Sequence, residues 1–95
     1  MSAECYLLRV NDNTVQSEIY LGGNGTRDDL RNLAKEQKLQ PAINEDGFTV
    51  LLIEREHLAV FMKSGPTLYG DPEGIIQSCR EEYKQEGQLQ LVIKS

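Results

Sequence analysis

The sequence has one histidine, two cysteines and no long apolar run. Because His57 is the only histidine, neither a two-histidine metal site nor a set of nucleophile, base and orienting residue can be assembled. Cys5 and Cys79 lie far apart without Cys-x-x-Cys spacing, which predicts two buried, free thiols. No segment approaches the roughly 18 apolar residues of a membrane span. We therefore expect no metal, no cofactor and no membrane-spanning segment.

Positive charge is also scarce. Ten Lys and Arg residues stand against fifteen Asp and Glu residues, which gives a net charge of −5 and a pI near 4.8. Nucleic acids and anionic membranes attract clustered positive charge, so neither is the expected partner. The opening residues MSAEC do not form a charged-then-apolar secretion signal. These observations predict a cytoplasmic protein.

A chain of 95 residues with 39% hydrophobic content predicts one domain, residues 1–95, with a single modest core. Residues 4–10 and 15–21 read as strands, and NDNT between them supplies residues that tolerate left-handed turn geometry. A helix is expected from about 27 to 38, with Thr26 and Asp29 as a capping box. The domain thus begins with a hairpin followed by a helix.

The middle of the chain carries two apolar runs, FTVLLIE and HLAVFMK, with only Arg55 and Glu56 between them. Both faces of each run are apolar, which predicts a second hairpin with a tight turn, or a single long bent strand. A helix is expected over about 73–86, because GDPEG marks its start and apolar side chains line one side of it. Leu89, Leu91 and Ile93 then alternate with Gln88, Gln90 and Val92 in a last strand.

This order, ββαββαβ, predicts an α+β fold. A terminal strand is poorly ordered unless it is tied down, and the apolar alternation of residues 88–94 indicates that this one is paired. The simplest arrangement inserts it beside the first strand, and parallel to it, in a mixed sheet with the helices packed on the sheet. That arrangement is the β-grasp (ubiquitin-like) fold. A ferredoxin-like fold would need a helix directly after the first strand, where no helical period is found.

The most distinctive surface feature is a line of positive charge on the first helix. At about 100° per residue, one flank of this helix carries four of the ten positive residues of an acidic chain. We call this flank the basic stripe, and it consists of Arg27, Arg31, Lys35 and Lys38. It is either a solvated helix flank or a docking strip for an acidic protein surface, to which Arg can bind carboxylates bidentately.

Three further features of the sequence suggest sites. GGNG before the first helix lacks the Gly-Lys-Ser/Thr ending of a phosphate loop, so a turn is the simpler interpretation. The acidic residues Asp71, Glu73 and Glu81 form either a plain acidic surface or a complementary docking face, and the spacing in DPEG provides too few ligands for calcium. A second hypothesis is a small enzyme or enzyme subunit with a pocket near Cys5, His57 or Cys79.

The ends of the chain resemble a known family. GDPEGIIQSCREEYKQEGQLQLVIK, preceded by CYLLRVNDNTVQSEIYL and TRDDLRNLAKEQKL, resembles the Phox-Bem interaction domains, which are β-grasp modules that pair with one another. The resemblance covers nearly the whole chain and consists of element order and sequence texture. Ras-association domains have a similar outline and use basic residues on the second strand and first helix, whereas the second strand here carries Glu18.

The resemblance implies a non-enzymatic protein–protein interaction module. Basic-faced Phox-Bem members carry a lysine on the first strand, and the nearest basic residue here is Arg9, which we add to the predicted partner-binding set. The expected partner is another protein with an acidic surface, or a second copy of this chain docked through opposite faces.

Overall fold

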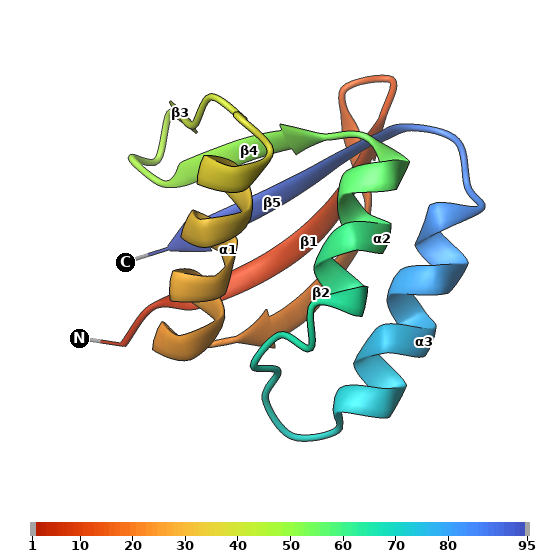
Figure 1. Ribbon diagram of the computed structural model, residues 1–95. Coiled ribbons are helices and arrows are strands. Elements are labelled where there is room, and N and C mark those ends of the chain that lie inside the picture. Colours follow the sequence, from red (N-terminus) through yellow and green to blue (C-terminus); the bar gives the residue numbers. More distant parts are fainter. Residues whose placement is uncertain (1, 95) are drawn as a thin grey trace.

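The computed structural model describes residues 2–94 of the chain. Within them, five strands form one antiparallel sheet in the order β2-β1-β5-β4-β3. All three helices lie on the same face of the sheet, with α2 between α1 and α3 (Figure 1). The elements are β1 Glu4–Asn11, β2 Thr14–Gly22, α1 Asn24–Glu36, β3 Ala42–Ile43, β4 Thr49–Ile53, α2 Arg55–Lys63, α3 Pro72–Tyr83 and β5 Gln88–Lys94.

The opening hairpin is confirmed. Asn11 pairs with Thr14, which leaves a loop of Asp12 and Asn13 with φ angles of 53° and 61°. Two-residue hairpin loops favour positive φ at both positions, because the resulting turn matches the right-handed twist of the strands. Asp and Asn tolerate this geometry better than other residues with a Cβ atom. The polar run NDNT therefore sets the register of β1 and β2.

The last strand lies inside the sheet, as predicted, but the direction predicted for it is wrong. β5 pairs with β1 on one side and with β4 on the other, and both pairings are antiparallel. The β-grasp assignment required β5 to run parallel to β1, so that assignment is overturned. The fold is α+β with an entirely antiparallel sheet.

The direction of β5 follows from an unexpected helix. The second apolar run, predicted as a strand of a second hairpin, forms α2 instead. α2 carries the chain away from the end of β4, and α3 brings it back beside the start of α2 (Figure 1). β5 therefore starts at the end of the sheet where β4 stops, and runs antiparallel to it. A hairpin followed by one helix would have delivered it to the opposite end.

α2 forms because its apolar residues also suit a helix. Leu58 and Phe61, three positions apart, are both buried, and Met62 packs against the same core. The helix begins after Glu54, whose backbone N–H donates to Nδ1 of His57 at 3.0 Å. Arg55 and Glu56, predicted as a turn, are thus the first two residues of α2. His57 is satisfied locally, as a capping residue.

α1 begins two residues before the predicted cap. Its N-cap is Gly23, and Thr26 is a buried residue inside the helix whose hydroxyl donates to the carbonyl of Thr67. Asp29 accepts from the backbone N–H of Thr67 at 2.7 Å. Thr26 and Asp29 therefore do not cap α1. Together they hold both backbone groups of Thr67, and so attach the loop that follows α2 to the helix.

The core lies between the sheet and the helix layer. Cys5, Leu7, Leu91 and other inward residues of the strands pack there against Leu30 of α1 and the buried residues of α2 and α3. α3 starts as expected, with Asp71 as N-cap and Pro72 in its first turn. Among residues 2–94 no helix has the length and apolar character needed to cross a membrane.

Candidate functional site

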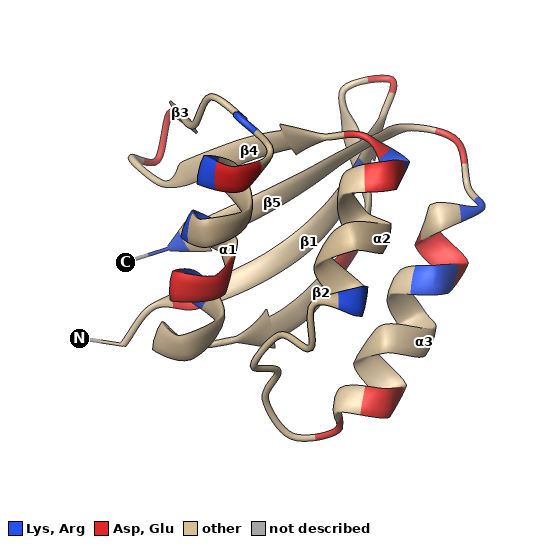
Figure 2. Cartoon of the chain, in the orientation of Figure 1, with Lys and Arg blue, Asp and Glu red and all other residues tan. Residues whose placement is uncertain are grey.

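The basic stripe lies on the outer flank of α1. The helix buries Thr26, Leu30, Leu33 and Ala34 against the sheet, whereas Gln37 caps the helix and is exposed. Arg31 and Lys35, one turn apart, are both exposed. Within residues 2–94 neither makes an ion pair or a side-chain hydrogen bond. Figure 2 shows that α1 carries charges of both signs.

The ends of the stripe differ from its middle. Arg27 is half-buried, and its Nε lies 3.4 Å from Oδ1 of Asp28, so its charge is partly balanced. Lys38 lies beyond the last residue of α1, with a φ angle of 57° and an exposed side chain. The helical part of the stripe, from Arg27 to Lys35, spans about 12 Å at 1.5 Å per residue. Arg31 and Lys35 are therefore its most available charges.

Cys5, at the start of β1, is buried beneath the start of α1. Burial raises the pKa of the Cys5 thiol from its ordinary 9.0 to about 11, although the positive charges of Arg27 and Arg31 act in the opposite direction. Both guanidinium charges thus favour the thiolate form of Cys5. Burial outweighs their effect, so the Cys5 thiol stays protonated at neutral pH.

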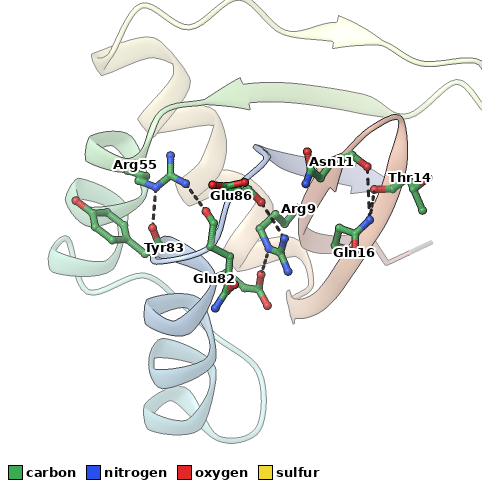
Figure 3. Close-up of polar contacts among 9 residues, drawn as sticks. Arg9, Asn11, Thr14, Gln16, Arg55, Glu82, Tyr83 and Glu86 are labelled. Atoms are coloured by element: carbon green, nitrogen blue, oxygen red, sulfur yellow. Dashed lines mark hydrogen bonds and ion pairs between the residues drawn. The ribbon is translucent and has the colours of Figure 1, made fainter.

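Arg9 does not belong with the stripe. Its Nε lies 2.5 Å from Oε2 of Glu82, and its Nη1 donates to the carbonyl of Glu86 at 2.9 Å (Figure 3). The two side chains are only 15% and 16% exposed. Arg9 therefore binds the end of α3, whereas the stripe lies on α1 at the other side of the helix layer. The structure separates it from the partner-binding residues with which it was grouped.

Arg55 has a related internal role that the sequence did not indicate. Its Nε donates to the carbonyl of Tyr83 at 2.7 Å, and its Nη2 donates to the carbonyl of Gln85. The last carbonyls of a helix have no partners within the helix, and a positive charge there is favourable. Arg9 and Arg55 approach the end of α3 from β1 and α2 (Figure 3). Both hold the fold together.

The predicted acidic face lies along α3. Asp71 accepts from the backbone N–H of Gly74 at 3.2 Å, so its side chain caps the helix. Glu73 stands in the first turn, and Glu81 accepts from Gln77 at 3.1 Å and lies 3.9 Å from Nζ of Lys84. All three carboxylates are exposed. Since Asp71 and Glu81 have local partners, Glu73 is the most available of the three.

The enzyme hypothesis placed a pocket near Cys5, His57 or Cys79, and these residues lie on three different elements, β1, α2 and α3. Cys5 lies beneath the start of α1, where its Sγ is 3.7 Å from the carbonyl of Gly23. His57 caps α2, and Cys79 is buried on α3, where burial raises the pKa of its thiol to about 11. Across the described chain, no group of three or more His, Cys, Asp and Glu residues is placed to hold a metal ion.

A groove of about 390 Å³ lies between α2 and α3, beside Cys79, which is one of the three positions near which the enzyme hypothesis placed a pocket. Cys79 lies in its wall, but its other lining residues supply neither a histidine nor a carboxylate that could activate the thiol. The signal that could have revealed this groove was the helical spacing of Leu58, Phe61 and Met62, which makes α2 a helix.

The chain was compared with protein-family models, curated proteins and solved structures, and none of them matches it. The resemblance to Phox-Bem and Ras-association domains therefore stays a prediction, and the β-grasp sheet that it implies differs from the observed one in the direction of β5.

Proposed function

We propose that this chain is a non-enzymatic protein–protein interaction module that binds an acidic protein surface through the basic stripe of α1. The observation that carries the proposal is the pair Arg31 and Lys35, which are exposed and unpaired within residues 2–94. In a chain with five excess negative charges, two neighbouring cations without carboxylate partners are a conspicuous surface feature.

The use of the other positive residues supports this choice. Arg9 and Arg55 bind the end of α3, and Lys94 lies over the rings of Tyr6 and Phe48, at 4.6 and 5.4 Å from the ring centroids. These three of the ten cations serve contacts within the fold. The remaining seven divide into two groups: the four residues of the stripe, and Lys63, Arg80 and Lys84 beside the groove between α2 and α3.

A solvated helix flank is the competing explanation for the stripe. It predicts that the charges of Arg31 and Lys35 can be changed without effect on any partner, because exposed substitutions alter stability by only about 0.5 kcal/mol. Docking predicts a large effect instead, since reversal places like charges opposite each other at an interface, which costs several kcal/mol. The two explanations agree on folding and differ on binding.

The test uses two charge-reversed variants. R31E/K35E changes the stripe, and R80E/K84E makes the same −4 change of net charge on α3. Partners captured by the wild-type chain are identified by mass spectrometry and titrated against all three proteins at low salt, after circular dichroism has verified the fold. We expect at least one captured partner with an acidic surface to lose at least about tenfold in affinity for R31E/K35E and to bind R80E/K84E unchanged, whereas a partner that uses the surface of Arg80 and Lys84 would show the reverse. Unchanged affinity of every captured partner for R31E/K35E would identify the stripe as a solvated flank.

A further inference from the structure

α2 and α3 enclose a groove that is lined from both helices. Arg55 at the start of α2 is bonded to carbonyls at the end of α3, so the helices run antiparallel and are joined at that end (Figure 3). α2 continues for nine residues, or about 12 Å. The lining residues extend along it from Leu58 to Lys63. The site is therefore an elongated groove of about 390 Å³.

The floor of the groove is apolar. Leu58 and Cys79 are buried, Met62 is half-buried and packs against the core, and Tyr83 is 39% exposed. Met62 and Tyr83 are the parts of this floor that water reaches, and they favour a ligand with large apolar side chains, because covering their apolar surface removes it from water. Tyr83 and Met62 suit such a contact, because one presents an aromatic ring and the other adapts its shape.

The rim of the groove is positively charged. Lys63, Arg80 and Lys84 line it and are exposed, and none of the lining residues is acidic. Figure 2 shows positive positions on both helices that border it. The nearest carboxylate contact is that of Glu81 with Lys84 at 3.9 Å, and these side chains are 56% and 70% exposed. An ion pair this exposed contributes little to stability, so Lys84 can exchange Glu81 for a carboxylate of a ligand.

The positive charges are spread along the groove. Arg80 and Lys84 are four residues apart on α3, which places them about one helical turn from each other. Lys63 ends α2, so it lies toward the opposite end of the groove from Lys84, which follows α3 beside the start of α2. A single anionic headgroup reaches only one end of this arrangement. A peptide with several carboxylates reaches all of it.

We propose that the groove between α2 and α3 binds a short amphipathic acidic peptide segment of a partner protein. Large apolar side chains of the segment pack on Ala59, Met62 and Tyr83. Its carboxylates, spaced at about one and two helical turns, pair with the cations of the rim. This is recognition of a helix in a groove, with charge selecting the sequence. The site is separate from the basic stripe, since it uses other residues on other helices.

The experiment selects the ligand without assuming its identity. A phage library of random peptides of about 15 residues, enough for four helical turns, is selected on the immobilised wild-type chain. We expect enriched sequences that combine Asp or Glu with Leu, Phe or Met at helical spacing. In labelled wild-type protein, the enriched peptides are expected to shift amide resonances of α2 and α3 and to leave those of α1 unchanged.

Three variants then localise binding. The affinity of the enriched peptides, measured by fluorescence anisotropy, is expected to fall at least about tenfold for R80E/K84E and to stay the same for R31E/K35E. Ala59→Trp, which fills the groove without touching its charges, is expected to weaken binding as well. Increasing ionic strength should lower the affinity, because it screens the exposed rim charges.

Several outcomes would overturn the proposal. One is that no acidic amphipathic sequence is enriched. Another is that the enriched peptides bind R80E/K84E as tightly as wild type, or that their resonance shifts lie outside α2 and α3. Binding of dodecanoate in the groove without any enriched peptide would identify a lipid site instead. The resonance shifts are measured on the wild-type chain, so a variant that fails to fold leaves this test intact.

Discussion

Nε of Arg9 on β1 lies 2.5 Å from Oε2 of Glu82 on α3, 73 residues later in the chain, and both side chains are almost enclosed. The guanidinium also donates to the carbonyl of Glu86 at 2.9 Å. This contact ties the last helix to the first strand. Removal of one partner from an ion pair with so little exposure destabilises the fold more than removal from a surface pair, because the other charge is left poorly solvated.

We therefore expect Arg9→Met to lower the free energy of unfolding by about 1–3 kcal/mol, between the values for exposed and for buried pairs. Urea unfolding monitored by circular dichroism measures this loss. Arg9→Met combined with Glu82→Met should be less destabilising than the two single changes added together, since the double variant leaves no unpaired charge. A loss below about 0.5 kcal/mol for Arg9→Met would show that the pair is no more than a surface contact.

The two faces of the sheet predict different costs for the same substitution. Leu91 on β5 is fully buried beneath the helices, whereas Leu52 on β4 is 57% exposed on the opposite face. Leu91→Ala should destabilise the protein by about 2–5 kcal/mol, because it removes buried methyl groups and leaves a cavity. Leu52→Ala should cost less than about 1 kcal/mol. Thermal unfolding of both variants checks this, and similar losses would mean that the open face is covered by another molecule in solution.

Alkaline pH should weaken the fold through its two thiols. Burial raises the pKa of both Cys5 and Cys79 from 9.0 to about 11. Below pH 9 the thiols are protonated in folded and unfolded chains alike, so their contribution to stability is complete. Between pH 9 and pH 11 the unfolded thiols ionise while the buried ones stay protonated, which favours unfolding, and the loss is complete once the pH has passed 11.

The control for this effect is C5A/C79A, which has no thiols. Its other groups are those of the wild-type chain. Between pH 9 and pH 11 the unfolding free energy of the wild-type chain should therefore fall relative to that of C5A/C79A. Parallel pH profiles would show that the thiols do not titrate in this way. At neutral pH a thiol-reactive reagent should modify the folded wild-type chain slowly. A fast reaction that accelerates with pH would instead favour the enzyme hypothesis.

Local patterns predicted the parts of the fold that depend on neighbouring residues. NDNT determined the first hairpin because its Asp and Asn accept positive φ, and the helical period of α1 separated its buried residues from the basic stripe. The pairing of residues 88–94 on both sides was also predicted, from alternation alone. These features need no knowledge of distant segments.

The errors have a common origin in contacts between distant segments. HLAVFMK is apolar at nearly every position, so its composition does not distinguish a buried strand from a helix. Its cap uses Glu54 and His57 in place of the commoner Ser or Thr with Glu, which concealed the helix start. The direction of β5 depended on that one element. Arg9 was assigned to the partner-binding set from the family resemblance, and its partner Glu82 lies too far along the chain for sequence spacing to connect the two residues.

The position of β5 determines when this protein can complete its fold during synthesis. The hairpin of β1 and β2 and the pair of β3 and β4 are connected within the sheet through β5. β5, residues 88–94, is the last of these strands to be synthesised. Until then the two pairs of strands cannot join into one sheet. Long-range pairing of this kind slows folding and leaves strand edges exposed in the meantime. We therefore expect a nascent chain to stay incompletely folded, and to bind chaperones, until β5 has left the ribosome.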